Sequence, residues 1–238
     1  MDRYLHYSFD LWLTLIRSNP DFKRERAGYF HRYYNPKDKS LEDVVSVFRQ
    51  VDIMCNRINE RVGGNIAAEE MYLMVISMLH EQEVDLRDID IAGLYNAMED
   101  LLMEHLPQVY ETATTSVLET LKGSGYSLNI LSNTGFIKGS TLRKVLCLLG
   151  LDRFFDFQLY SDEFGMSKPN RSFFIHMLRE VEQLKGAELD PGLVLHTGDN
   201  PVADIEGGRG AGVATFLINS NEQTILSLLQ HAPALFVP

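Results

Sequence analysis

Residues 123–132 read Gly-Ser-Gly-Tyr-Ser-Leu-Asn-Ile-Leu-Ser, a glycine-rich turn followed by a short apolar run that ends at a hydroxyl residue. The preceding stretch, about 111–122, repeats its apolar residues at helical spacing. This region therefore predicts a helix, a turn and a buried strand at about 126–131. A helix that leads through a tight turn into a buried strand is the repeating unit of a parallel sheet.

The same alternation continues toward the C-terminus. Further strands are predicted at 157–160, 193–196 and 213–218, and helices at about 138–149, at 171–185, after Pro201 and from Asn221. Strands that alternate with helices are joined by right-handed crossovers into a parallel sheet that helices cover on both faces. The fold class predicted for this part of the chain is α/β.

The N-terminal part of the chain combines one strand with a long helical block. Residues 3–9 predict a short strand that stops at Asp10, and from Asn19 to about His105 only helical signals occur. Helix starts are indicated by Asn19-Pro20, by a capping box at Ser40 and by Asn65 as a cap. The predicted organisation is an α/β core made of residues 1–17 and 107–238, with an all-helical subdomain of residues 18–106 inserted after the first strand.

Polar side chains follow the predicted strands where the strands end. They are Asp10, Ser132 with Asn133, Lys168 and Asp199. In open parallel sheets, ligands bind beyond the carboxyl ends of the strands, so these residues are expected on one rim. Two carboxylates there could share Mg²⁺, which prefers oxygen ligands. Lys168 would offset excess negative charge, and Ser132 would hold an anionic substrate oxygen.

Four motifs carry a resemblance to a known family. They read Phe-Asp-Leu-Trp-Leu-Thr-Leu at 9–15, Leu-Ser-Asn-Thr at 131–134, Ser-Asp-Glu-Phe-Gly-Met-Ser-Lys-Pro-Asn at 161–170, and Gly-Asp-Asn-Pro-Val-Ala-Asp at 198–204, the last continuing to Gly212. The four motifs occur in this order, each after a predicted strand. With this arrangement the sequence resembles the haloacid dehalogenase (HAD) superfamily. The resemblance implies a Rossmann-like core, and the helical block is similar to the helical cap that the family inserts after its first motif.

The resemblance also implies roles for individual residues. Asp10 would be the nucleophile that forms an aspartyl-phosphate intermediate, and Ser132 and Lys168 would bind the transferring phosphoryl group. Thr14 and Asn133 would belong to the substrate-binding set. The metal set would be Asp10, the backbone carbonyl of Trp12, Asp199 and Asp204, the last as an outer or additional metal residue.

The first motif departs from the family pattern in one position. Phosphatases of this family place a second aspartate two residues after the nucleophile, as general acid and base, and that position is Trp12 here. Indole cannot transfer a proton as a general acid or base near neutral pH, so a phosphorylated substrate with a good leaving group, such as an acyl phosphate, is favoured. The alternatives are an impaired protein that binds a phosphorylated ligand or a protein partner, and a 2-haloacid dehalogenase or phosphonatase-like enzyme.

Composition narrows the function classes further. The 238 residues include 22 Lys and Arg against 33 Asp and Glu, a net charge of −11, which argues against nucleic-acid binding. No apolar run is long enough for a membrane span, and a cytoplasmic location is expected by elimination. The sequence does not indicate an oligomeric state.

One segment is basic although the chain as a whole is acidic: residues 17–39 hold seven Lys or Arg and three Asp or Glu. We expect some of these cations to face the substrate, with the candidates being Lys23, Arg24, Arg26 and Arg32.

Overall fold

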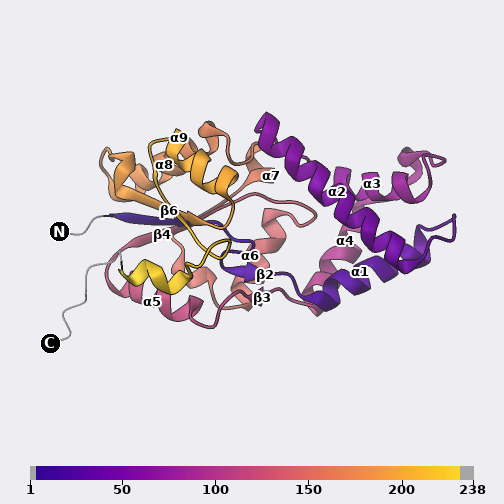
Figure 1. Cartoon of the computed structure of the whole chain (residues 1–238), viewed down its shortest axis with the longest axis horizontal. Helices are drawn as coiled ribbons and strands as arrows, with labels where there is room; N and C mark the ends of the chain where they lie inside the picture. The colour runs from indigo at the N-terminus through magenta and orange to yellow at the C-terminus, as the bar shows by residue number, and fades with distance from the viewer. Residues whose placement is uncertain (1–3, 231–238) are drawn as a thin grey trace.

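The computed structural model describes residues 4–230, and a parallel sheet forms its centre (Figure 1). The five strands are β1 (His6–Phe9), β4 (Ser127–Ser132), β5 (Phe157–Tyr160), β6 (Val194–Gly198) and β7 (Ala214–Leu217). Their order across the sheet is β5-β4-β1-β6-β7, and every neighbouring pair is parallel. The predicted α/β fold class is confirmed. β1 lies in the middle of the sheet, so the residue that follows it emerges at the centre of the rim.

Helices cover both faces of this sheet, as the alternating pattern predicts. They are α5 (Thr114–Gly123), α6 (Gly139–Leu148), the short α7 (Ser161–Phe164), α8 (Arg171–Lys185) and the short α9 (Gly207–Gly210). Apolar residues of α5 and α6 pack in one buried cluster with Leu128 and Ile130 of β4. Leu131 of the same strand packs in a separate cluster with α8. Successive residues of a strand point to opposite faces, and this alternation separates the two clusters.

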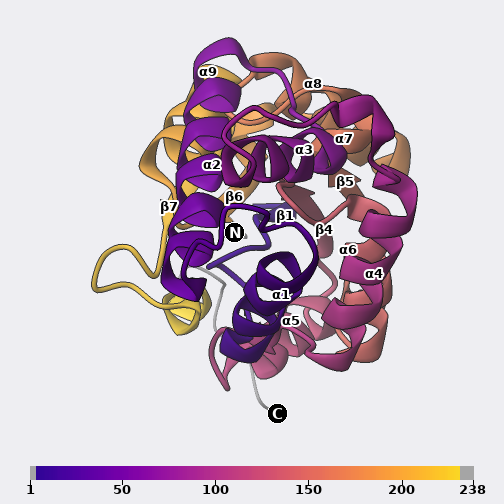
Figure 2. The same ribbon diagram turned by 90° about the vertical axis from the view of Figure 1, so that its right-hand side faces the viewer.

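Residues 20–104 form a helical insert with its own core. Its helices are α1 (Pro20–Tyr33), α2 (Leu41–Val62), α3 (Ala68–Leu79) and α4 (Ile91–Glu104). They gather beyond one end of the sheet, and Figure 2 shows them from that end, in front of the strands. A buried cluster that includes Phe30, Phe48, Met71 and Tyr72 holds them together. Among the described residues, no helix is both long and apolar enough to cross a membrane.

A short antiparallel ribbon joins the helical insert to the sheet. β2 (Ile16–Arg17) leads into the insert and β3 (Gln108–Val109) leads out of it. Ile16 pairs with Val109 and Arg17 with Gln108, so the two crossings of the chain lie side by side. The sequence pattern does not predict this ribbon, because two-residue strands carry no period.

Several local predictions are corrected by the structure. Asn65 does not cap α3, which begins at Ala68 with the carboxylate of Glu70 accepting from the backbone N–H of Ala67. The expected helix after Pro201 begins as a π-helical turn over Pro201–Glu206, and the helix expected from Asn221 is a 3₁₀ segment over Ile225–Gln230. Shorter 3₁₀ turns occur at Leu86–Asp88, Asp152–Phe154 and Pro191–Leu193.

Candidate active site

Three charged side chains meet where the central strands end. Asp10 follows β1, Lys168 lies in the loop after α7, and Asp204 lies in the π-helical turn after β6. The ammonium of Lys168 lies 2.8 Å from Oδ1 of Asp10 and 2.6 Å from Oδ1 of Asp204. Lys168 and Asp204 are each 1% exposed and Asp10 is 7% exposed. A buried charge needs a partner of opposite sign, and here one cation lies between two carboxylates.

The ionisation of these groups follows from that burial. Desolvation raises the pKa of Asp10 to about 6, with Lys168 acting in the opposite direction and Asp204 adding to the rise. Burial alone would also raise the pKa of Asp204, but the charge of Lys168 and the hydrogen bond from His196 hold it well below its ordinary value. Burial would lower the pKa of Lys168, yet the two carboxylates raise it. Lys168 is therefore a cation at neutral pH, and Asp204 is an anion.

A third acidic residue completes a group that can hold a cation. Asp199 directly follows β6, and burial together with the charges of Asp10 and Asp204 raises its pKa to about 7. Carboxylate oxygens of Asp10, Asp199 and Asp204 all lie within 4.8 Å of one another. Three carboxylate oxygens this close repel one another, and a hard divalent cation relieves that repulsion. The donor set therefore fits Mg²⁺.

His196 and Asn200 fix the position of Asp204. Nε2 of His196 lies 3.1 Å from Oδ1 of Asp204, and the backbone N–H of Asn200 donates to Oδ2 at 3.0 Å. Burial lowers the pKa of His196, so its ring is neutral and Nε2 carries the proton that the carboxylate accepts. Nδ1 then accepts from the hydroxyl of Ser8, 2.9 Å away. Sequence reasoning does not assign His196 or Asn200 to the site, although Asn200-Pro201 has the same capping form as Asn19-Pro20.

The residues predicted to bind substrate occupy different positions. Asn133 lines the cleft, and its side chain both donates to the carbonyl oxygen of Lys168 and accepts from its backbone N–H. Ser132 is fully buried, and its hydroxyl donates to the carbonyl oxygen of Asn133 at 3.1 Å. Thr14 is also buried, and its hydroxyl donates to Oδ2 of Asp10 at 3.1 Å. Ser132 and Thr14 are not among the residues that line the cleft.

Trp12 stands where the family pattern predicts a proton donor, and Leu13 follows it in the same turn. Both line the cleft, and the ring of Trp12 packs partly against the core. Leu13 has a φ of 58°, a left-handed conformation that favours glycine, and its side chain is 52% exposed. Asn219 holds this turn, because its side-chain amide donates to the carbonyl oxygens of Leu13 and Thr14.

The site opens into a cleft of about 770 Å³ between the sheet and the helical insert. Asp10, Lys168 and Asp199 line the cleft on the core side. The insert contributes residues of α1 and α2, which are Phe22, Lys23, Arg26, Ala27, Val45, Phe48, Arg49, Asp52, Ile53, Asn56, Asn59 and Glu60. Of the four cations expected to face the substrate, Lys23 and Arg26 line the cleft, whereas Arg24 and Arg32 do not.

The insert and the core also contact each other directly beside the cleft. The side-chain amide of Asn200 donates to Oε1 of Glu60 at 2.9 Å, and the backbone N–H of Ser167 donates to the carbonyl oxygen of Gly63 at 3.1 Å. The hydroxyl of Ser161 donates to Oδ1 of Asn65 at 2.7 Å. The end of α2 is thus bound to the loop that carries Lys168.

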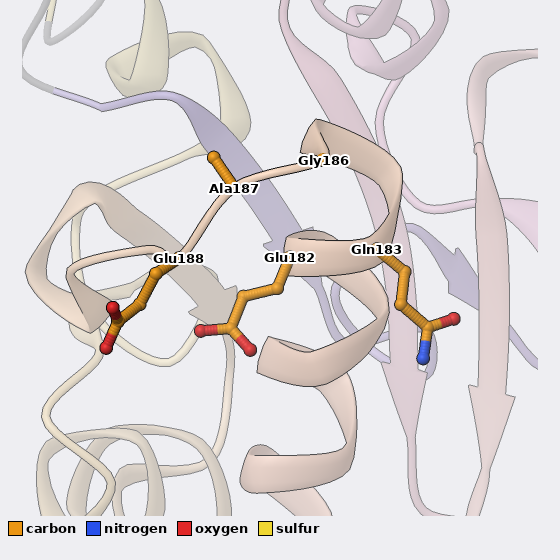
Figure 3. A pocket seen from close by; sticks show the side chains of 5 residues that line it. All are labelled: Glu182, Gln183, Gly186, Ala187 and Glu188. Carbon is orange, nitrogen blue, oxygen red and sulfur yellow. The ribbon is translucent and has the colours of Figure 1, made fainter.

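A second hollow lies at the end of α8, away from the residues described above. Figure 3 shows its lining, which consists of Glu182, Gln183, Gly186, Ala187 and Glu188. Oε1 of Glu182 accepts from the backbone N–H of Leu189 at 3.4 Å. None of the motif residues lines this hollow, so the chemistry is assigned to the cleft at the rim of the sheet.

A family model matches most of this chain, and named relatives match parts of it. A model of the haloacid dehalogenase-like hydrolase family matches residues 8–212. Glyceraldehyde 3-phosphate phosphatase of Methanothermobacter thermautotrophicus is 36% identical over 109 residues, which are 45% of this chain and 43% of that protein. Pyrimidine 5′-nucleotidase YjjG of Escherichia coli is 34% identical over 109 residues, 45% of this chain and 44% of that protein. The matched segments therefore span less than half of these two relatives.

Solved structures share the fold over nearly the whole chain. The HAD-hydrolase YfnB of Bacillus subtilis, solved with magnesium, superposes with a TM-score of 0.73 at 20% identity, covering 96% of this chain and 98% of that one. A 2-haloacid dehalogenase of Pseudomonas syringae pv. Tomato superposes with a TM-score of 0.65 at 17% identity, covering 96% and 97%. At these identities the likeness concerns the fold. Together with the family match across all four motifs, it confirms the resemblance seen in the sequence: the chain is a member of the haloacid dehalogenase-like hydrolases.

Proposed function

We propose that this hydrolase is a Mg²⁺-dependent phosphatase that acts on a small phosphorylated metabolite, with Asp10 as its nucleophile. The observation that carries the proposal is the pairing of Asp10 with Lys168 at 2.8 Å, beside two further carboxylates at the base of the cleft. Neutral residues in place of Asp199 and Asp204 would favour displacement of halide, and this chain keeps both acids. The phosphatase and nucleotidase names of the two relatives support phosphoryl chemistry.

The metal would be held by the side chains of Asp10, Asp199 and Asp204, with the backbone carbonyl of Trp12 as a further oxygen donor. When bound, Mg²⁺ offsets the negative charge of the phosphoryl oxygens and so favours attack by an anion. The position of Asp204 does not depend on the metal alone, because His196 and the backbone of Asn200 already hold its carboxylate. No side chain of residues 4–230 is hydrogen-bonded to the carboxylate of Asp199, and its raised pKa makes its charge state sensitive to a bound cation.

The chain's own groups account for the two chemical steps. A carboxylate oxygen of Asp10 attacks phosphorus, and the bond between phosphorus and the leaving oxygen breaks as the aspartyl phosphate forms. Water then attacks phosphorus, releases inorganic phosphate and restores Asp10. Lys168 offsets negative charge throughout, and Thr14 holds one oxygen of Asp10 so that the carboxylate keeps its orientation. Ser132 and Asn133 would bind the phosphoryl oxygens once substrate displaces their present contacts.

Trp12 restricts the substrate to one with a good leaving group. Its ring lines the cleft, where a phosphatase of this family would place the acid that protonates the departing oxygen. General acid–base help is worth roughly 10²- to 10⁴-fold, and an alkyl ester needs it most. An acyl phosphate leaves as a carboxylate that requires no proton, so it is the preferred class.

The helical insert is proposed as the cap of this enzyme, over residues 18–106. Its α1 and α2 line the cleft opposite Asp10, and it touches the core through Glu60, Gly63 and Asn65. Closing such a lid excludes water from the first step and sets specificity.

Phosphate release from acyl, aryl and sugar phosphates, with and without Mg²⁺, tests the proposal. We expect turnover that needs Mg²⁺ and falls at least ~10³-fold in Asp10→Asn, because nucleophile removal in other enzymes costs more than that. Asp100→Asn, an exposed change on α4, is the matched control. Absence of turnover across the panel, with phosphate-analogue binding retained, would instead identify a protein that binds phosphorylated ligands without cleaving them.

A further inference from the structure

One cation of the cleft is partly buried and has a nitrogen atom without a hydrogen-bond partner in the described part of the chain. Arg26, on α1, lies among three aromatic rings, with its guanidinium carbon 4.2 Å from the ring centre of Phe48, 4.7 Å from Phe136 and 5.2 Å from Phe22. Its Nε is buried and has no hydrogen-bond partner among the described residues. Aromatic faces attract a cation but accept no strong hydrogen bond, so part of the guanidinium is left unsatisfied.

Nearby groups do not supply the missing acceptor. Asp52 lies close enough to affect the charge of Arg26, yet no carboxylate of residues 4–230 is ion-paired with it. Burial lowers the pKa of Arg26 and the nearby hydroxyl of Tyr72 acts in the opposite direction, but that hydroxyl makes no hydrogen bond of ordinary geometry within residues 4–230. By contrast, Arg24 on the same helix is exposed and ion-paired with Asp21 and Glu25.

The position of Arg26 relative to the nucleophile indicates which group would supply its missing hydrogen-bond acceptor. Arg26 and Asp10 line the same cleft, one on the insert and one on the core, so a single ligand can reach both. Lys23 and Arg49 line the cleft on the same side and add positive charge. Arg binds carboxylate and phosphate oxygens through its planar set of N–H donors, which matches the geometry of both anions.

We propose that Arg26 is a specificity-determining residue that binds a second anionic group on the substrate, a carboxylate or a second phosphoryl group, held across the cleft from the phosphorus that Asp10 attacks. The rings of Phe22, Phe48 and Phe136 surround the guanidinium of Arg26 with apolar surface. This lowers the local dielectric and strengthens an ion pair formed there. The inference deepens the proposed function and rests on it. It restricts the substrate class to phosphorylated compounds that carry two anionic ends.

Binding to the Asp10→Asn protein tests this without requiring turnover. The ligands are alkylphosphonates of increasing chain length whose far end carries a carboxylate, a second phosphonate or a methyl group, and the measurement is calorimetric titration with Mg²⁺ present. At one chain length we expect a carboxylate or phosphonate end to bind about 10- to 100-fold more tightly than the methyl end, as a charge-assisted hydrogen bond predicts. Preference between the two anionic ends identifies which anion Arg26 binds.

Substitutions then assign the effect to Arg26. Arg26→Met in the Asp10→Asn background should remove the preference for the anionic end and leave methyl-ended ligands unchanged, while Arg26→Lys should keep part of it. Arg24→Met is the matched control and should keep all of it, because Arg24 does not line the cleft. Thermal unfolding of each variant checks the fold, and Arg26→Lys carries the test if Arg26→Met does not fold.

The inference and the proposed function fail in different ways. Equal affinity for anionic and methyl ends, or a preference that survives in Arg26→Met, would overturn the role of Arg26 and assign it to packing among the rings. Loss of phosphate release from every substrate, with the binding preference intact, would overturn the phosphatase proposal and leave the anion subsite standing. In active enzyme, Arg26→Met should raise KM for a substrate with two anionic ends while kcat changes little.

Discussion

The ammonium group of Lys168 lies 2.6 Å from Oδ1 of Asp204, and both side chains are only 1% exposed. The same ammonium contacts Asp10 at 2.8 Å, so one lysine is ion-paired with two carboxylates from distant parts of the chain. Attraction between buried opposite charges is strong, but so is the cost of removing them from water. Removal of any one of these three charges would therefore change the charge balance of the other two in the protein interior.

Removing that lysine should destabilise the protein. Lys168→Met leaves the carboxylates of Asp10 and Asp204 buried without their cation, and breaking a buried ion pair costs about 3–5 kcal/mol. Urea unfolding near neutral pH, compared with the exposed change Lys185→Met, measures the loss. The deficit should shrink at acidic pH as Asp10 takes up a proton. A loss below about 1 kcal/mol would show that the two carboxylates are satisfied by other groups.

Replacing Trp12 should restore a missing proton donor. Trp12→Asp places a carboxyl group on the cleft wall, and hydrolysis of alkyl phosphates should rise by roughly 10²- to 10⁴-fold, with little change for acyl phosphates. The side chain of Trp12→Asn has nearly the same shape as that of Trp12→Asp but has no acidic proton, so it serves as the control. Equal rates in the two variants would mean that the site lacks more than an acid.

Leu13 offers a test of local strain. A left-handed conformation costs an L-residue about 1–2 kcal/mol, and the Leu13 side chain is half exposed and buries little. Leu13→Gly should therefore raise the free energy of unfolding by about 0.5–1 kcal/mol. The rest of the relieved strain is offset because glycine gives the unfolded chain more conformational entropy. Leu148→Gly, at an exposed position of α6, should lower it by about 1 kcal/mol. Destabilisation by both changes would show that the Leu13 side chain packs more than its exposure indicates.

Magnesium should stabilise the protein more at alkaline than at acidic pH. The folded pKa values of Asp199, about 7, and of Asp10, about 6, lie above the ordinary value of 3.8. The metal-free folded state therefore binds more protons than the unfolded state between about pH 4 and 7, and these groups' contribution to stability falls as pH rises through that window. Mg²⁺ needs the ionised carboxylates, so its effect grows over the same window.

The rise in Tm on adding MgCl₂, measured near pH 5 and near pH 8, checks this expectation. Asp199→Asn should remove most of the rise at alkaline pH, while Asp100→Asn should leave it unchanged. A rise in Tm that is equal at both pH values would exclude these carboxylates as the groups that titrate with metal binding.

The sequence predicted the sheet and its rim because both rest on short-range signals. Apolar runs that end at Asp10, Ser132 and Asp199 indicate strands, and parallel strands bring their carboxyl ends together. Asp10 and Lys168 are 158 positions apart in the chain, yet their contact follows from that topology. The domain boundaries and the individual roles of these residues stay predictions, which the variants above are designed to test.

Other features depend on tertiary contacts that no local pattern contains. Asn65 has the form of a helix cap, but the nearby hydroxyl of Ser161 binds its side chain instead. Val45 and Ile58 fall at helical spacing with the core residues of α2, yet they are 49% and 40% exposed, because the insert leaves that side of the helix open. Arg26 resembles its neighbours Lys23 and Arg24 in the sequence, and the aromatic rings that surround its guanidinium are brought together only by the fold.

The ribbon of β2 and β3 determines how the helical insert can move. Backbone hydrogen bonds pair Ile16 with Val109 and Arg17 with Gln108, so the strands entering and leaving the insert are joined to each other. Two separate tethers would let the insert slide, tilt and rotate independently. A paired ribbon resists sliding of one strand along the other, whereas twisting and bending of the whole ribbon leave its hydrogen bonds intact. If the contacts of Glu60, Gly63 and Asn65 with the core are broken, we expect the insert to swing about this ribbon rather than slide along the core.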